Sequence, residues 1–221
     1  TIRAEVSRYL VKQNLANSYI YEAEKLFNEN TNLHYKYYYL NRRMAILAEY
    51  YNTTPDSLTK VKEIGHQILE NATEIKDKSI IVYTLNEIGY LDFNRNPENA
   101  LPYFLKAYAI AKEYDVKIAF IDVCINLGRF YQQKNNDITT AKKFYKEAVN
   151  QAKIINNLWQ IQQCYNELKN INTLDNNFKE AMFYGDSLNE INSKISFYSS
   201  NKRYELLENK IIIEFFYKPK N

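Results

Sequence analysis

One helical stripe recurs along the chain at a nearly constant interval. In its clearest copy the members are spaced four, three and four residues apart, which places them on one face of a helix. The copies are Ala100, Phe104, Ala107 and Ala111; Ala141, Tyr145, Ala148 and Ala152; Ala181, Gly185, Leu188 and Asn192; Val61, Gly65, Ile68 and Ala72; and, more weakly, Tyr19, Ala23, Leu26 and Asn30. The first members lie 42, 39, 41 and 40 residues apart in chain order. A fixed period in the range of roughly 20 to 50 residues indicates an array of repeated supersecondary units.

The helix before each stripe repeats as well. Leu85-Asn86-Glu87-Ile88-Gly89 is echoed by Cys124-Ile125-Asn126-Leu127-Gly128. Antiparallel helices approach to about 8 to 10 Å only where the side chains at the contact are short. We therefore expect Gly89, Gly128, Ala107 and Ala148 to lie where neighbouring helices meet.

Polar breaks divide the chain into pairs of helices. The predicted pairs are 2–13 with 16–29, 33–52 with a helix that opens at Pro55, 77–93 with 97–114, 116–134 with 137–155, and 157–173 with 177–193. Asn96 and Thr54 are predicted N-caps, each followed by a proline at the first helical position. Pro102 would remove a hydrogen bond inside its helix, so that helix is expected to start late or to bend.

These residues resemble the tetratricopeptide repeat. That repeat has a small residue late in its first helix, an aromatic residue three positions on, as Tyr131 follows Gly128, and an Ala-x3-aromatic-x2-Ala pattern in its second helix. The interval is closer to a long variant of about 40 residues than to the usual 34. The sequence departs from the pattern at Lys169, Gly65 and Gly185. The resemblance implies an all-α, right-handed superhelix of about five helical hairpins plus a C-terminal helix.

The predicted repeat domain covers residues 1–193, with residues 1–39 as a degenerate first unit, and residues 194–221 form the C-terminal helix. In that helix the members of one apolar seam are Tyr204, Leu207, Ile211 and Phe215. A three-four-four spacing is typical of helices that pair. The helix is expected to cap the last repeat, to begin a linker to a further domain, or to pair two chains as a homodimer.

The residue types that carry catalysis are scarce and scattered. His34 and His66 are the only histidines and fall in different units, and the four glycines are isolated in helices, so neither a metal motif nor a phosphate loop is present. Cys124 and Cys164 are interpreted as small buried side chains. We therefore expect no enzyme, no cofactor and no metal site.

Charge and hydropathy exclude two further classes of function. The net charge is +3 and the pI is about 8.6, below the basic footprint of about 9 or more that is usual for nucleic-acid-binding domains. Basic and aromatic residues interleave in the stretch 34–43, as they do in grooves that bind single-stranded nucleic acid. The preferred interpretation is one amphipathic helix, in which Tyr37, Leu40, Met44 and Leu47 form a buried stripe. No run of about 18 apolar residues exists, so no membrane span is expected in this region.

The resemblance also implies a groove lined by the first helix of each hairpin, with a protein or peptide as its ligand. The groove residues that it implies are Tyr83, Asn86, Glu87, Tyr90 and Asn94; Asp122, Asn126, Arg129 and Gln133; and Gln163, Asn166 and Asn170.

Asn86, Asn126 and Asn166 recur every 40 residues. Because an amide both donates and accepts hydrogen bonds, such a ladder could hold the backbone of an extended peptide. Alternatively, each Asn bonds a neighbouring helix. Trp159 is expected to pack between units rather than to bind a ligand.

The long Tyr-, Asn- and Lys-rich repeats look like the sensor regions of Bacteroidetes-type repeat regulators, in which a membrane span and an output domain follow. The first expectation is therefore a protein-binding module of a larger bacterial signalling or transcription regulator, either cytoplasmic or periplasmic. The alternatives are a stand-alone adaptor or peptide receptor and a self-associating scaffold.

Overall fold

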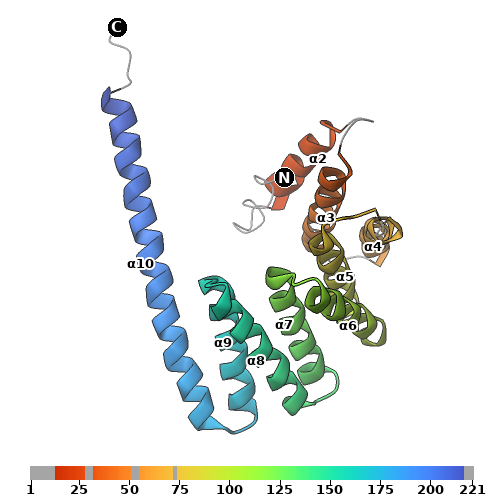
Figure 1. Ribbon diagram of the computed structural model, residues 1–221, viewed down its shortest axis with the longest axis vertical. Helices are drawn as coiled ribbons and strands as arrows, with labels where there is room; N and C mark the ends of the chain where they lie inside the picture. Colours follow the sequence, from red (N-terminus) through yellow and green to blue (C-terminus); the bar gives the residue numbers. More distant parts are fainter. Residues whose placement is uncertain (1–12, 28–31, 51–54, 72–73, 217–221) are drawn as a thin grey trace. The chain divides into compact units, whose positions relative to one another are not determined.

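The computed structural model describes residues 13–27, 32–50, 55–71 and 74–216, and within these ranges every regular element is a helix (Figure 1). The chain divides into two compact units, residues 1–144 and 145–221. The boundary falls inside helix α8, Ile138–Ile154. The expected all-α fold built from helical hairpins is therefore confirmed, and each unit is described by itself below.

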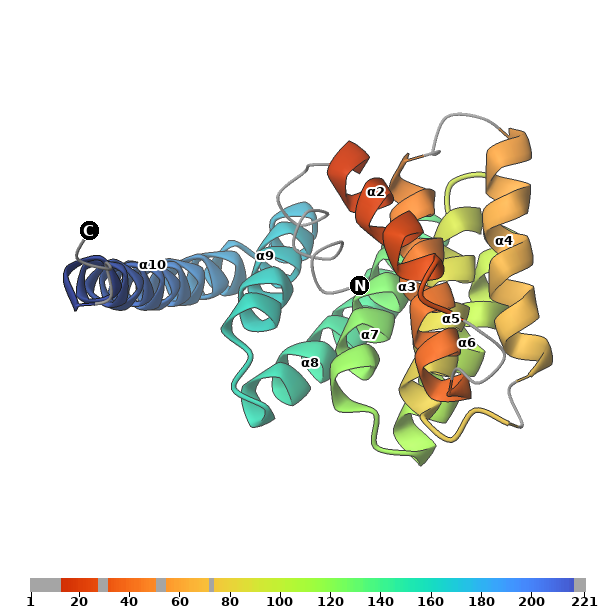
Figure 2. The same cartoon turned by 90° about the horizontal axis from the view of Figure 1, so that it is seen from above.

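The first unit repeats one packing arrangement. Its helices are α2 (Gln13–Glu24), α3 (Leu33–Tyr50), α4 (Pro55–Glu70), α5 (Lys78–Asp92), α6 (Pro97–Glu113) and α7 (Lys117–Gln133). Each helix from α2 to α6 packs on the next one along the chain, and α5 also packs on both α3 and α7 (Figure 2). The first helices of successive hairpins, α3, α5 and α7, therefore form a continuous layer, which we call the first-helix layer.

The second unit contains the end of α8, then α9 (Leu158–Leu174) packed along α10 (Phe178–Phe216). Helix α10 has 39 residues and no break at residue 193, so the expected C-terminal helix continues the second helix of the last hairpin. The reason is that neither Gly nor Pro occurs between Gly185 and Pro219. The side chains of residues 202–216 lie outside the described part, as do residues 1–12, so the apolar seam and the first predicted helix stay predictions.

The recurring stripes form the core in the middle repeats, whereas Leu26 in the first copy and Asn192 in the last are exposed. Ala100, Phe104, Ala107 and Ala111 are at most 1% exposed, and Ala141, Tyr145, Ala148 and Ala152 are fully buried. A Cβ atom built on Gly89 would lie 2.7 Å from the Phe104 Cε1 atom. Helices α5 and α6 thus approach too closely at Gly89 for a side chain, as the sequence predicts.

Asparagine and aspartate adopt the left-handed backbone conformation that glycine usually adopts at helix ends. Among the described residues, those with positive φ are Asp115, Asn136, Asn156 and Asn176, at 51° to 55°, and each follows a helix. At Asn156 and Asn176 the next N–H closes the helix end, with Asn157 donating to the Ala152 carbonyl at 3.0 Å and Asn177 to the Asn172 carbonyl at 2.9 Å. The Asn157 side chain then caps α9 by accepting from the Gln160 N–H.

The expected irregularity at Pro102 does not delay α6. That helix begins at Pro97 with Asn96 at its N-cap position, although the Asn96 side chain makes no capping hydrogen bond. Pro102 is exposed. Water can therefore solvate the Glu98 carbonyl that an N–H at position 102 would otherwise bond.

Candidate functional site

Two helices of the first-helix layer present tyrosines around one arginine. The Arg42 guanidinium on α3 lies 5.7 Å from the centroid of the Tyr38 ring and 5.0 Å from the centroid of the Tyr83 ring on α5. Tyr90 is 50% exposed two helical turns beyond Tyr83. We call Tyr38, Arg42, Tyr83 and Tyr90 the tyrosine face. A cation held over aromatic rings is attracted by their π-electrons, so Arg42 is oriented before any ligand arrives.

Buried hydrogen bonds between α3 and α5 lie next to the tyrosine face. Asn41 donates from its side-chain nitrogen to the Thr84 hydroxyl at 3.0 Å, and Thr84 donates to the Ile80 carbonyl at 2.8 Å. The Arg42 Nε atom donates to the Asn41 side-chain oxygen at 3.1 Å. Because these groups link α3 to α5, they fix the position of Arg42 relative to both helices.

The two asparagines predicted in the first unit bond each other. The Asn126 side-chain nitrogen on α7 donates to the Asn86 side-chain oxygen on α5 at 3.0 Å. Asn86 is 6% exposed and Asn126 is half-buried. This geometry fits the alternative in which each Asn bonds a neighbouring helix. A hydrogen bond between two side chains of adjacent first helices fixes the register of the layer.

The other predicted groove residues differ in exposure. Glu87, Asp122 and Arg129 are half-buried and each has an interaction partner in the structure, whereas Asn94 and Gln133 are exposed at the ends of α5 and α7. Gln163, Asn166 and Asn170 are exposed on α9, in the second unit. Arg42, which the resemblance also places in the groove, is half-buried beside Tyr38, an exposed tyrosine that the predicted groove residues did not include. Their i, i+4 spacing on α3 was the signal in the sequence.

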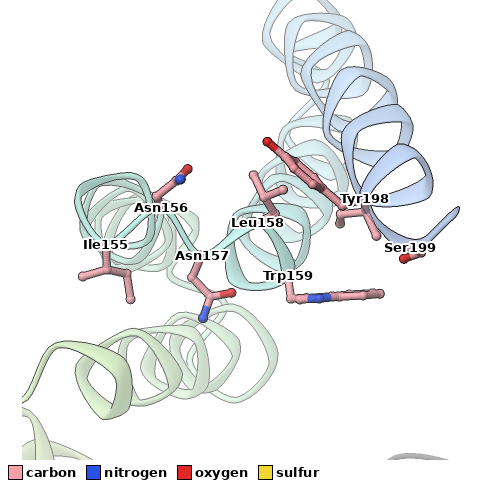
Figure 3. A pocket seen from close by; sticks show the side chains of 8 residues that line it. Ile155, Asn156, Asn157, Leu158, Trp159, Tyr198 and Ser199 are labelled. Carbon is pink, nitrogen blue, oxygen red and sulfur yellow. The ribbon is translucent and has the colours of Figure 1, made fainter. Parts of the chain in front are cut away.

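The second unit contains an open pocket of about 430 Å³ where the α8–α9 turn meets α10. Figure 3 shows the Tyr198 ring reaching from α10 toward the turn and the Trp159 ring reaching toward α10. The remaining lining residues are Ile155, Asn156, Asn157, Leu158, Ile195 and Ser199. Apolar rings beside amides and a hydroxyl suit a mixed aromatic and polar group of a ligand.

The expectation for Trp159 was wrong. Its side chain is 64% exposed, where it lines this open pocket in the first turn of α9. As the only tryptophan in the chain, it reports on this pocket by fluorescence.

Ionisable groups in the described part are arranged for packing and surface pairing. No group of three or more His, Cys, Asp or Glu side chains in that part could hold a metal ion. Cys124 and Cys164 are buried thiols, as expected. Burial raises the pKa of the Tyr39 phenol, and burial, followed by the Glu180 carboxylate, raises the pKa of Tyr184.

In the stretch 34–43 and just after it, Tyr37, Leu40 and Met44 are all at most 8% exposed. The aromatic and basic pattern is therefore that of an amphipathic helix, as predicted. Among the described helices, none combines the length and apolarity that a membrane crossing requires.

No family model matches the chain, and no curated protein matches it. A solved structure, the crystal structure of BtubC (BKLC) from P. vanneervenii, resembles it with a TM-score of 0.62 and 16% sequence identity. The similarity covers 87% of this chain and 78% of that one. At this identity it shows that the two chains share a helical fold.

Proposed function

We propose that the chain is a non-enzymatic tetratricopeptide-type module that binds a segment of another protein. The tyrosine face is the observation that carries this proposal. The interval of about 40 residues, the small residue at each helix contact and the first-helix layer support the assignment to the repeat class.

The chemistry of the tyrosine face suits a peptide. Tyrosine offers a large, rigid, half-apolar surface with few rotatable bonds, so ordering it on binding costs little entropy. Arg42 is already held between two rings and presents a cation to an incoming carboxylate. The preferred ligand is therefore an extended segment that carries an aromatic or aliphatic side chain close to an acidic one.

The place of this module in a larger bacterial signalling or transcription regulator rests on the repeat pattern alone. The alternative is a stand-alone adaptor or peptide receptor with the same binding face. Sequencing the gene downstream of the codon for Asn221 separates them. A membrane span or an output domain there supports the regulator, and a stop codon supports the adaptor.

Selection from a random peptide library displayed on phage tests the binding function directly. The purified chain is immobilised, and enriched peptides are synthesised and titrated by calorimetry. Tyr90→Ala is expected to weaken binding about ten-fold or more, as is typical of a tyrosine at the centre of an interface. Leu105→Ala is the control, since Leu105 is 41% exposed but lies on the second helix α6.

Failure to enrich any peptide, or equal losses from Tyr90→Ala and Leu105→Ala, would refute binding at the tyrosine face. Arg42→Gln separates the two contributions. It should weaken the acidic peptides selectively while leaving the apolar ones bound.

A further inference from the structure

Helix α10 exposes two phenylalanines on the side that α9 does not cover. Phe183 and Phe197 are 62% and 63% exposed. They lie 14 residues apart, about 21 Å along the helix, and within about 40° of each other around its axis. Among residues 178–201 of α10, the buried side chains lie on another side, where Ala181, Ile191 and Ile195 are at most 9% exposed.

Three charged side chains fill the stretch between the two rings. Asp186, Glu190 and Lys194 are exposed, and the Lys194 amine donates to a Glu190 carboxylate oxygen at 2.6 Å. At 100° per residue, all five side chains fall within an arc of about 80°. We call Phe183, Asp186, Glu190, Lys194 and Phe197 the outer face of α10.

We propose that the outer face of α10 binds the outer face of a second copy of this chain, with the two helices antiparallel. The pattern complements its own reverse: the rings lie at equal distances on both sides of Glu190, and the acid on one side lies as far from Glu190 as the base on the other. Antiparallel pairing about Glu190 brings Phe183 toward the partner's Phe197 and Asp186 toward the partner's Lys194. A two-fold axis makes both contacts occur twice.

The charges decide between the two orientations. Parallel pairing places Asp186 beside the partner's Asp186 and Lys194 beside the partner's Lys194, so like charges repel at both contacts. Antiparallel pairing places opposite charges next to each other at both sites. Only Glu190, near the two-fold axis, lies beside the same residue of the partner. Complementary charges fix orientation and register more than they raise affinity, so the phenylalanine rings supply most of the binding.

A second copy of the chain carries a surface that matches the outer face of α10. A helix that matches both the rings and the charges of this face carries two apolar anchors about 21 Å apart and charges in the reverse order, and α10 itself is such a helix. The inference does not depend on the proposed peptide binding, because the tyrosine face lies in the first unit.

Sedimentation velocity of the full chain over a wide range of concentration tests the proposal. The wild type is expected to shift from monomer to dimer as the concentration rises. Phe183→Ser and Phe197→Ser should each raise the dimer dissociation constant about thirty-fold, as for residues central to an interface. Phe178→Ser is the matched control: Phe178 is 60% exposed on the same helix but lies outside the arc.

Charge reversal tests the orientation. Asp186→Lys and Lys194→Asp should each weaken the dimer, and the double variant should recover part of the loss, because opposite charges then meet again. Glu190→Gln should tighten the dimer by removing the repulsion at the axis. A wild type that stays monomeric at every concentration, or a Phe178→Ser loss equal to that of Phe183→Ser, overturns the proposed face. Absence of recovery in the double variant overturns the antiparallel arrangement.

Discussion

Replacement by alanine is expected to destabilise the fold at Gly89 and to stabilise it at Gly185. Gly89 lies where α5 meets α6, and an added Cβ atom would stand 2.7 and 2.8 Å from two ring atoms of Phe104 and 3.2 Å from the Ala100 carbonyl oxygen. Ordinary contact begins at 3.4 Å, so the Phe104 ring would have to retreat by about 0.7 Å. That ring is fully buried and lies 6.5 Å from the ring of Phe93, centroid to centroid.

The magnitude follows from two opposing terms. Overpacking a close-packed core costs about 1 to 3 kcal/mol, while replacing glycine by alanine inside a helix gains about 0.5 to 1 kcal/mol. Gly89→Ala is therefore expected to lower the free energy of unfolding by up to about 2.5 kcal/mol. Gly185 in α10 has only the Lys169 Cδ atom nearby, at 4.0 Å. Gly185→Ala should therefore keep the whole gain.

Urea unfolding followed by far-UV circular dichroism measures both variants against the wild type. The reasoning requires a lower midpoint for Gly89→Ala and a higher one for Gly185→Ala, with unchanged slopes. A stabilised Gly89→Ala variant would mean that α5 and α6 separate at little cost, and the close approach of the hairpin would then not be a constraint on the fold.

Three further predictions concern single contacts. Asn86→Ala leaves the Asn126 amide without its bonded oxygen and should lower the free energy of unfolding by about 1 to 3 kcal/mol. In a urea double-mutant cycle, Asn86→Ala combined with Asn126→Ala should lower it by about 1 kcal/mol less than the sum of the two single changes. Asn176, at φ 55°, should tolerate Gly in thermal melts and lose about 1 kcal/mol with Ala, because the left-handed region disfavours a β-carbon. The hydrogen bonds that the Asp137 carboxylate accepts from Thr140 lower its pKa, so they stabilise the fold above about pH 3.9, and this contribution is lost as the pH falls through the depressed folded pKa. Asp137→Asn should therefore flatten the dependence of stability on pH in acid, and an unchanged acid profile would contradict this role.

Local sequence patterns predict most of the helices and the core of the middle repeats. The predicted ranges 77–93, 97–114 and 116–134 agree to within one residue at each end with α5, α6 and α7. The signals are local: a stripe with a period near 3.6 residues marks the buried face, and Asn or Asp at the turns marks where each helix ends. Interactions of this range are complete within a few residues, so the sequence carries them without reference to the rest of the fold.

Which neighbour each helix face contacts depends on the packing of helices that are distant in the chain. The spacing of Asn86 and Asn126 is equally compatible with a peptide ladder and with a bond between the two residues, and the packing of α5 on α7 gives the bond. Trp159 was predicted to pack between units, but the structure leaves its side chain exposed. Periodicity states which side chains share a face of a helix. Whether that face is covered depends on helices distant in the chain, whose approach is set by side-chain volume and contact geometry rather than by spacing.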